Sequence, residues 1–234
     1  MTTTQTTAPT TLTLTAAQWR ALDTHKATER TRYAMEYAAW SPATDKARDW
    51  LASAGVVCAT DGKRALYLPT EHAPAAVGLA AIPTVSKAKR AQSDAYPCAL
   101  LADGTEGRHY PPVLDVIPSK GTGLEIPTDS LRALFAPFAT DPDNDAVRCW
   151  FGLGIRCASR SAVTDVSVNA TWSNAPSDDH DAIGLGAAYV LAVCDAADRL
   201  GASLVTVQAT NHRSAVCFDL SGKALALVMP RFLS

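Results

Sequence analysis

The fold of this chain is decided by the stretch ATDGKR (Ala59–Arg64), taken together with YPPVLDVIP (Tyr110–Pro118) and LVMPRFL (Leu227–Leu233). Each stretch alone is ordinary. Asp-Gly is one of the commonest β-turn signals, the two adjacent prolines indicate a turn, and a Met-Pro pair near the end of a chain carries little information. The information lies in their order and in their separation along the chain.

The composition is that of a globular protein. The chain has 234 residues, of which 47% are hydrophobic and 19% are charged, and this length suits one large domain or two smaller ones with separate cores. No run of about 18 apolar residues occurs, so no membrane-spanning helix is predicted. The first ten residues are rich in threonine and lack the regions of a signal peptide, so we expect a disordered tail.

The charge and the cysteines exclude several classes of protein. Up to Ser119 the chain has 12 Lys and Arg against 11 Asp and Glu, and from Lys120 onward it has 9 against 12. Neither half is therefore a strongly basic module that binds nucleic acid through charge alone. The six cysteines include no CxxC pair and no nearby CxxH, so we predict neither a zinc site nor a redox pair. We expect reduced core cysteines in a cytoplasmic protein.

The first half of the chain reads as strand, helix and further strands. Alternating Leu and Thr indicate a short strand before a helix that begins at about Ala16. Strands are then predicted over Tyr33–Trp40 and Trp50–Thr60. A segment rich in Pro, Ala and Gly leads to the basic stretch TVSKAKRAQ, and more strand and turn follow up to Pro118.

The second half repeats this order. It begins with the strand LEIP and a helix for which Thr128 is the predicted N-cap. One buried helix face is predicted from apolar residues spaced three and four apart, namely Leu131, Leu134, Phe135 and Phe138. A second helix, Ala187–Leu200, should bury Val190, Val193, Cys194 and Ala197 and end at Gly201. Strands are predicted at Ala146–Ala158, Thr164–Trp172, Ser203–Gln208, Ala215–Leu220 and Leu225–Met229.

These motifs resemble the bacterial DNA polymerase III β sliding clamp. RYAMEY at Arg32–Tyr37 stands where the family's middle domain has a strand beginning Arg-Tyr. ATDGKRA matches the family's ATDGHRL, and LADGTEGRHYPPVLDVIP matches L-x-D-G-x-FPDYRRVIP with an insertion. In the last domain, IGLGAAYVLAVC (Ile183–Cys194) parallels IGFN-x-x-YLLDAL, and LVMPRFL parallels the terminal VMPMRL. No counterpart of the family's first domain is recognised.

The resemblance implies an α+β fold of two clamp-type modules, 11–118 and 124–234, joined by a linker at 119–123. Each module should have antiparallel sheets outside and two helices inside. Two-module chains would close a six-module ring most simply as a homotrimer. Such a ring implies double-stranded DNA as a partner, together with polymerase or repair proteins that carry clamp-binding motifs, and a possible clamp loader. It also implies a cytoplasmic protein that associates with the nucleoid.

A peptide-binding cleft between the two modules is also implied. In the family, a linear motif of a partner protein places its apolar end there. The matching residues are Met35, Thr60, Gly62, Lys63, Arg64, Pro111, Val116, Val228, Met229 and Pro230. Gly62 would allow a tight turn, Met229 would form an adaptable wall, and Arg64 would bond the peptide or lock the loop.

Several residues depart from the family at this cleft. Lys63 replaces a histidine, Asp115 replaces the second arginine of FPDYRR, and Arg231 and Phe232 replace Met-Arg. Changes of charge at the rim of a cleft alter which peptides bind. We therefore expect this cleft to have its own choice of partner.

Contact with DNA would require basic side chains on the inner helices, where they meet phosphates without reading sequence. The candidates are Arg20, Lys26, Lys87, Lys89, Arg90, Arg132 and Arg199. Asp195 and Asp198 share the helix of Arg199, so a solvated face of mixed charge is the other interpretation in the second half.

No pattern indicates catalysis, a metal or a cofactor. DPDND at Asp141–Asp145 lacks the glycine and glutamate of a calcium loop, and DDHD at Asp178–Asp181 suits a solvated loop better than a metal. FGLG and IGLG lack the third glycine of a dinucleotide loop. We predict no enzymatic activity, with a hydrolase using Cys58 or a metal at His180 as an outside alternative. Two hypotheses remain: a processivity factor that encircles duplex DNA, and a clamp-like adaptor or decoy that binds clamp-interaction peptides without closing around DNA.

Overall fold

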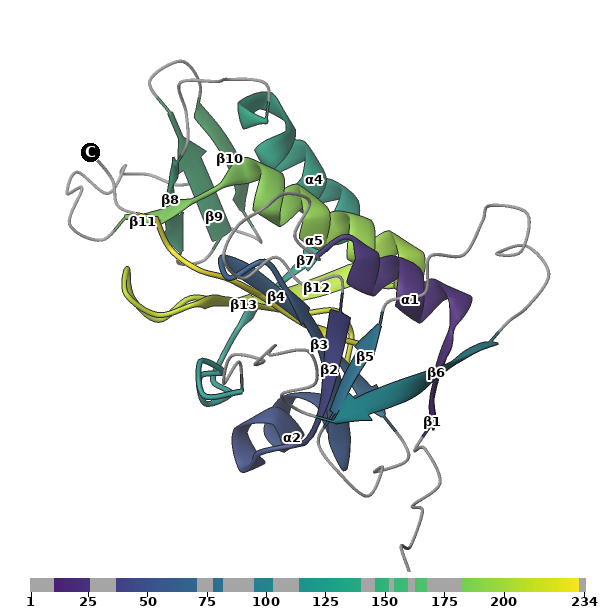
Figure 1. The fold of residues 1–234 in the computed structure, drawn as a ribbon. Coiled ribbons are helices and arrows are strands. Elements are labelled where there is room, and N and C mark those ends of the chain that lie inside the picture. The colour runs from purple at the N-terminus through teal and green to yellow at the C-terminus, as the bar shows by residue number, and fades with distance from the viewer. Residues whose placement is uncertain are drawn as a thin grey trace, which may run out of the picture.

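The computed structural model describes residues 11–25, 37–70, 78–81, 95–102, 114–139, 146–151, 154–159, 163–167 and 182–231. The described strands form two antiparallel sheets, with helices packed against them (Figure 1). The fold class is therefore α+β, as predicted.

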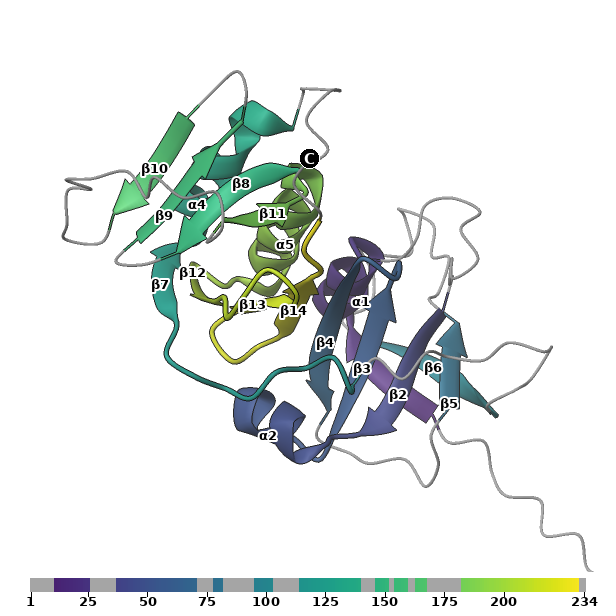
Figure 2. The same ribbon diagram turned by 90° about the vertical axis from the view of Figure 1, so that its left-hand side faces the viewer.

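The larger sheet has ten strands and runs through both halves of the chain. Its strands, in spatial order, are β1 Thr11–Thr15, β6 Ala95–Ala102, β5 Gly78–Ala81, β2 Tyr37–Pro42, β3 Gly55–Thr60, β4 Arg64–Thr70, β14 Leu225–Val228, β13 Val216–Asp219, β12 Leu204–Gln208 and β7 Leu124–Pro127. The halves meet where β4 pairs with β14, with Arg64 opposite Val228 and Tyr67 opposite Leu225. This junction is visible from the side in Figure 2.

The smaller sheet belongs to the second half. Its four strands, in order, are β10 Val163–Ser167, β9 Gly154–Ala158, β8 Val147–Phe151 and β11 Ile183–Leu185. Near the C-terminus, Arg231 forms an isolated antiparallel bridge with Gly184 of β11. The end of the chain thus connects β14 in the larger sheet to β11 in the smaller one.

A layer of helices packs onto one face of the larger sheet. It contains α1 Ala16–Asp23, α4 Thr128–Phe135 with the short 3-10 helix η2 Ala136–Phe138, and α5 Ala187–Leu200. Helix α5 packs against both α1 and α4 (Figure 1). The apolar face predicted for α4 and η2 is confirmed, because its four leucine and phenylalanine side chains are at most 2% exposed.

The ends of α1 and α5 follow from local chemistry. The Thr15 hydroxyl accepts a hydrogen bond from the Gln18 amide at 3.2 Å, and the Gln18 side chain accepts one from the Thr15 amide at 2.8 Å. This capping box satisfies two amides that the first turn leaves unbonded. Helix α5 ends at Gly201, whose φ is +65°, a left-handed conformation that glycine adopts without strain. Both ends confirm the predicted boundaries.

A second core lies on the opposite face of the sheet. Here α2 Asp45–Leu51 contributes Trp50, which packs with Tyr67, Ile117 and Leu227. The Trp50 indole donates a hydrogen bond to the carbonyl of Pro118 at 3.0 Å. Alternate residues of β4 and β14 therefore serve two different cores, as strand geometry requires.

Three predicted boundaries were wrong. The strand predicted at Trp50 begins only at Gly55, because Thr44 caps α2 by accepting from the Ala47 amide at 3.3 Å. The single strand predicted over 146–158 is a hairpin of β8 and β9. The strand predicted over 33–40 is described as β2 Tyr37–Pro42, and its predicted start lies outside the described residues. Thr128 is not the N-cap of α4; Pro127 is, and the Thr128 hydroxyl donates to the Ala202 carbonyl at 2.8 Å.

The division into two modules stays a prediction. The predicted linker is held at its first and middle residues by one side chain, since Gln208 accepts from the Gly121 amide at 2.6 Å and donates to the Ser119 carbonyl at 3.0 Å. The predicted second inner helix of the first half falls outside the described residues. Within the described part of the chain, five cysteines are buried thiols, and no helix is long and apolar enough to cross a membrane.

Candidate functional site

The turn between β3 and β4 is locked by its own side chains. The Asp61 carboxylate accepts from the amides of Lys63 and Arg64, both at 2.9 Å, and pairs with the Arg64 guanidinium at 3.0 Å. The Thr60 hydroxyl accepts from the Gly62 amide at 3.0 Å and donates to the Arg64 carbonyl at 2.6 Å. Gly62 has a φ of +84°, which a side chain would strain. The turn is therefore a rigid feature of the surface.

The C-terminal stretch is attached directly to this turn. The Met229 amide donates to the Lys63 carbonyl at 2.8 Å, and two residues later the Arg231 amide donates to the Gly184 carbonyl at 2.9 Å. Met229 is half-buried and packs against the second core, as does Leu114 from the segment before β7. Parts of all three opening stretches thus border the same junction.

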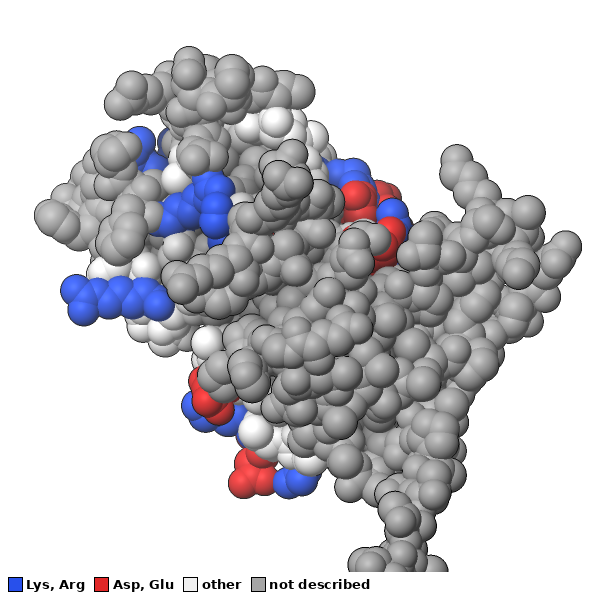
Figure 3. Space-filling view, in the orientation of Figure 1, with Lys and Arg blue, Asp and Glu red and all other residues white. Residues whose placement is uncertain are grey.

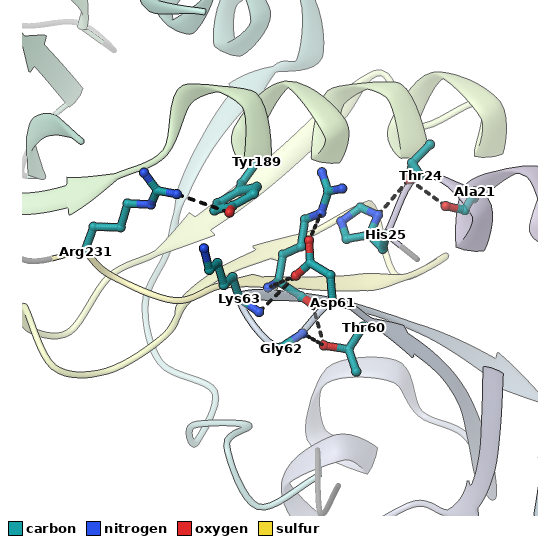
Figure 4. Close-up of polar contacts among 10 residues, drawn as sticks. Ala21, Thr24, His25, Thr60, Asp61, Gly62, Lys63, Tyr189 and Arg231 are labelled. Atoms are coloured by element: carbon teal, nitrogen blue, oxygen red, sulfur yellow. Dashed lines mark hydrogen bonds and ion pairs between the residues drawn. The ribbon is translucent and has the colours of Figure 1, made fainter. Parts of the chain in front are cut away.

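Tyr189 of α5 contacts the guanidinium groups of two arginines at this junction, and one of them, Arg231, is labelled in Figure 4. The guanidinium of Arg64 is 5.2 Å from the centre of the Tyr189 ring, and that of Arg231 is 5.1 Å from it. Arg231 also donates a hydrogen bond to the Tyr189 hydroxyl at 3.2 Å. Cation–π contacts of this kind hold planar groups in a defined geometry.

His25, at the end of α1, is a buried neutral group next to the same turn. Its side chain has no exposed surface, and burial, with the nearby charges of Arg64 and Arg199, lowers its pKa to about 3. The Thr24 hydroxyl donates to the Ala21 carbonyl at 2.6 Å and lies 2.7 Å from His25 Nδ1. This arrangement assigns the proton to Nδ1 and leaves Nε2 as a buried acceptor, for which the structure gives no hydrogen-bond partner.

The helix layer has almost balanced charge. Helices α1, α4 and α5 carry three arginines and four aspartates, a net charge of −1. Arg132 pairs with Asp195 at 2.7 Å and with Asp198 at 2.5 Å, and the hydrogen bond to Asp195 raises the Arg132 pKa further. On the face shown in Figure 3, blue and red groups are in contact where α4 and α5 lie.

The other two described basic residues of this layer differ from Arg132. The Arg199 guanidinium donates to the backbone carbonyl of Arg20, which links α5 to α1. The Arg20 side chain is exposed and donates to the Ala16 carbonyl at 3.1 Å. The remaining predicted DNA-facing residues, Lys26, Lys87, Lys89 and Arg90, lie outside the described residues.

The structure describes eight of the ten predicted cleft residues. Met35 and Pro111 lie outside the described residues. Gly62, Lys63, Arg64, Met229 and Pro230 meet at the junction, and Val116 is 47% exposed on the segment before β7. Thr60 and Val228 are buried at 4% and 0% exposure. Their side chains support the junction from within.

Three residues have roles here that the sequence did not predict. They are Asp61 of the turn, Tyr189 of the helix stretch and Arg231 of the C-terminal stretch. Their positions at one junction depend on contacts between distant segments. No local signal marked His25. Among the described residues, no cluster of three or more His, Cys, Asp or Glu could hold a metal ion.

Comparison with solved structures identifies the fold. Over its whole length the chain matches a DNA polymerase sliding clamp from Pseudomonas aeruginosa with a TM-score of 0.62 and 15% identity, covering 69% of that chain. It matches the DNA polymerase III β subunit of Thermotoga maritima over 96% of its length, with a TM-score of 0.63 and 12% identity, covering 65% of that chain. It matches a β sliding clamp of Caulobacter crescentus over its whole length, with a TM-score of 0.64 and 15% identity, covering 67% of that chain. No protein-family model and no curated protein matches the sequence.

The chain therefore has the sliding-clamp fold, and it spans about two thirds of the clamps that it matches, which corresponds to two of their three domains. The expected resemblance is confirmed at the level of the fold. At these identities the likeness concerns the fold alone.

Proposed function

We propose that this chain is a sliding-clamp-like protein that tethers partner proteins through a linear peptide bound at the junction of β4, β14 and α5. The observation that carries this proposal is the hydrogen bond from the Met229 amide to the Lys63 carbonyl. It joins the C-terminal stretch to the rigid β3–β4 turn, and these are two of the three segments that build the peptide cleft implied by the resemblance.

The chemistry of the junction suits a peptide ligand. A preorganised turn loses little conformational freedom when a ligand binds, which favours affinity. Met229 offers a flexible apolar wall that accommodates different side chains. Val116, whose side chain is 47% exposed, supplies apolar surface on the segment before β7.

A titration tests the proposed peptide site. A fluorescein-labelled peptide with a sliding-clamp-binding motif is titrated with the wild type, Met229→Ala and Gly62→Trp, and anisotropy is recorded. We expect affinity to fall about fivefold for Met229→Ala, which loses about 1 kcal/mol of apolar contact, and further for Gly62→Trp. The control, Leu204→Ala, removes an exposed side chain on β12, three strands from β4. Equal affinity in all four proteins contradicts the proposal.

Enclosure of duplex DNA is the first candidate for what the clamp does as a whole. The helix layer α1–α5–α4 supports it, because such a layer on one face of a continuous sheet is what a ring needs to line a central hole. This candidate assigns the chain a role in DNA replication or repair, as a homotrimer in the cytoplasm and without catalysis of its own. Light scattering that finds a stable trimer at micromolar concentration favours it.

A clamp-like adaptor that binds peptides without closing around DNA is the second candidate. The charge of the described helix layer favours it: a net charge of −1, with Arg132 neutralised by two aspartates, offers little to phosphates. A monomer at micromolar concentration that still binds the labelled peptide supports the adaptor and contradicts the ring.

A further inference from the structure

We propose that Cys149 and Cys157 are a redox-active thiol pair, which hydrogen peroxide converts into a disulfide across the β8–β9 hairpin. The two Sγ atoms lie 3.3 Å apart. No redox pair is predicted from the sequence, because these cysteines are eight residues apart and lack the CxxC spacing. The pair belongs to the smaller sheet, and this inference is independent of the proposed peptide site.

Strand pairing places the two cysteines at a separation that suits a disulfide. Strands β8 and β9 lie side by side (Figure 2), and Cys149 is directly opposite Cys157 in their antiparallel register. Residues opposed in this way have their side chains on one face of the sheet and their Cα atoms about 4.5–5.5 Å apart. Disulfides join Cα atoms that are about 4.4–6.8 Å apart. Because an S–S bond is about 2 Å long, the two sulfurs at 3.3 Å must approach by only about 1.3 Å.

The hydrogen bonds of the pair define its reduced state. The Cys149 thiol donates to the Val147 carbonyl at 3.5 Å, which leaves the Cys149 sulfur to accept the S–H of Cys157. Both cysteines are fully buried. Burial, and then the hydrogen bond with Cys157, raise the pKa of Cys149, so this residue is a protonated thiol at neutral pH. The pair therefore stays reduced until the hairpin opens to an oxidant.

A small oxidant reaches the pair through local opening of the sheet. Cys149 is also paired with Ile183 of β11, and Cys157 with Thr164 of β10, so both cysteines lie on interior strands. Native proteins open locally without unfolding as a whole, and hydrogen peroxide is little larger than water. We expect a slow reaction that follows the opening of the hairpin, in contrast to the fast reaction of an exposed thiolate.

The oxidation consumes one peroxide for each pair. In the opened hairpin one thiol loses its proton, and its sulfur attacks an oxygen of hydrogen peroxide. The O–O bond breaks, the departing hydroxide takes up that proton to form water, and the sulfur becomes a sulfenic acid. The sulfur of the other cysteine then attacks the sulfenic sulfur, the S–O bond breaks, and the hydroxyl group leaves as water with the second thiol proton. The two sulfurs thus give two electrons to the peroxide.

Tryptic mapping of the wild type tests the inference directly. Trypsin cleaves between the two cysteines, which places one on peptide 149–156 and the other on peptide 157–160. The folded protein is treated with hydrogen peroxide, unfolded in urea with N-ethylmaleimide to block the remaining thiols, digested without reductant and analysed by mass spectrometry. We expect these two peptides to be joined, with two hydrogen atoms fewer than their sum, and to separate again in dithiothreitol.

The methionines of the same sample serve as an internal control for exposure to peroxide. If both peptides are recovered as maleimide adducts when the methionines are already oxidised, the inference is overturned. Linkage of either peptide to another cysteine of the chain, in place of the expected pair, also overturns it.

Two alanine variants, checked for folding by circular dichroism, complete the test. Cys157→Ala removes the partner thiol, so Cys149 should stop at the sulfenic acid, which dimedone traps, whereas the wild type should lose this adduct to the disulfide. Cys194→Ala removes a buried thiol of α5 and should form the linked peptides as the wild type does. Equal dimedone labelling of Cys149 in the wild type and Cys157→Ala, or loss of the linkage in folded Cys194→Ala, overturns the pairing. The mapping of the wild type needs no variant, so it decides the question even if Cys157→Ala does not fold.

Discussion

Replacing Asp61 by alanine should destabilise the protein far more than replacing an aspartate of similar local geometry on the surface. Asp61 accepts three hydrogen bonds, two from backbone amides at 2.9 Å and one from Arg64 at 3.0 Å. Hydrogen bonds to charged groups contribute about 1.5–3 kcal/mol each, and their effects overlap because all three end on one carboxylate. The substitution also leaves the largely buried Arg64 without its counterion. We expect a loss of about 3 kcal/mol of unfolding free energy.

The matched control is Asp45→Ala. Asp45 pairs with Arg48 three residues away at 2.8 Å, as Asp61 does with Arg64, but these side chains are 96% and 53% exposed. Exposed pairs of this kind are worth about 0.2–1 kcal/mol. Urea unfolding followed by tryptophan fluorescence and by circular dichroism measures both variants, and coincident transitions justify a two-state treatment. A double-mutant cycle with Arg64→Ala then isolates the pair. If Asp61→Ala and Asp45→Ala lose the same free energy, the reasoning about the locked turn is refuted.

Three further predictions concern the core, the pH response and the helix layer. Phe135→Ala should lose about 3–5 kcal/mol of unfolding free energy in the same assay, because Phe135, the last residue of α4, is only 1% exposed; a loss below about 1 kcal/mol contradicts the assigned core. His25 has a folded pKa of about 3, below the 6.5 of an unfolded histidine, so the unfolded state binds more protons between these values and stability should fall as pH decreases from about 6.5 toward 3, by up to about 1.4 kcal/mol per pH unit. His25→Gln should remove this part of the pH slope, and an identical slope in both proteins argues against a buried neutral histidine. Changing Asp195 and Asp198 together to asparagine changes the net charge of the helix layer from −1 to +1. Mobility-shift assays at low salt should then show that the variant binds duplex DNA about fivefold more tightly than the wild type. Unchanged binding means that this face does not meet DNA.

Elements with a strong internal period could be predicted from the sequence. The buried face of α4 and the whole of α5 with its terminal glycine follow from spacing along one helix and from one cap. Helix α2 was missed because its seven residues are too few to show a helical period, and Trp50 also suits a strand. Thr128 has the residue type of an N-cap, yet its hydroxyl bonds to Ala202, 74 residues away. Tertiary contacts overrode the local preference at that position.

In the candidate site, too, tertiary contacts decide what the local sequence leaves open. The resemblance indicated which segments meet, and the residues of the β3–β4 turn could be listed from ATDGKR alone. The sequence is compatible with Arg64 binding a peptide or locking the loop, and in the structure Arg64 pairs with Asp61 of the loop and contacts the Tyr189 ring. Arg132 was a candidate for DNA contact, but two aspartates of another helix neutralise it. In each case the deciding partner was a side chain whose position the local pattern does not specify.

The sequence by itself determined the fold class, most of the elements of the second half and the three stretches that border the candidate site. It could do so because helix and strand periods, caps and turns are set by residues only a few positions apart. Only the tertiary structure decided that one sheet runs through both halves at β4 and β14, and that Tyr189 contacts both Arg64 and Arg231. Only the structure, too, revealed that the charges of the helix layer nearly cancel. The physical reason is that charge pairing and ring contacts act over a few ångströms in space, and packing brings together residues such as Arg132 and Asp195 that are 63 positions apart in the chain.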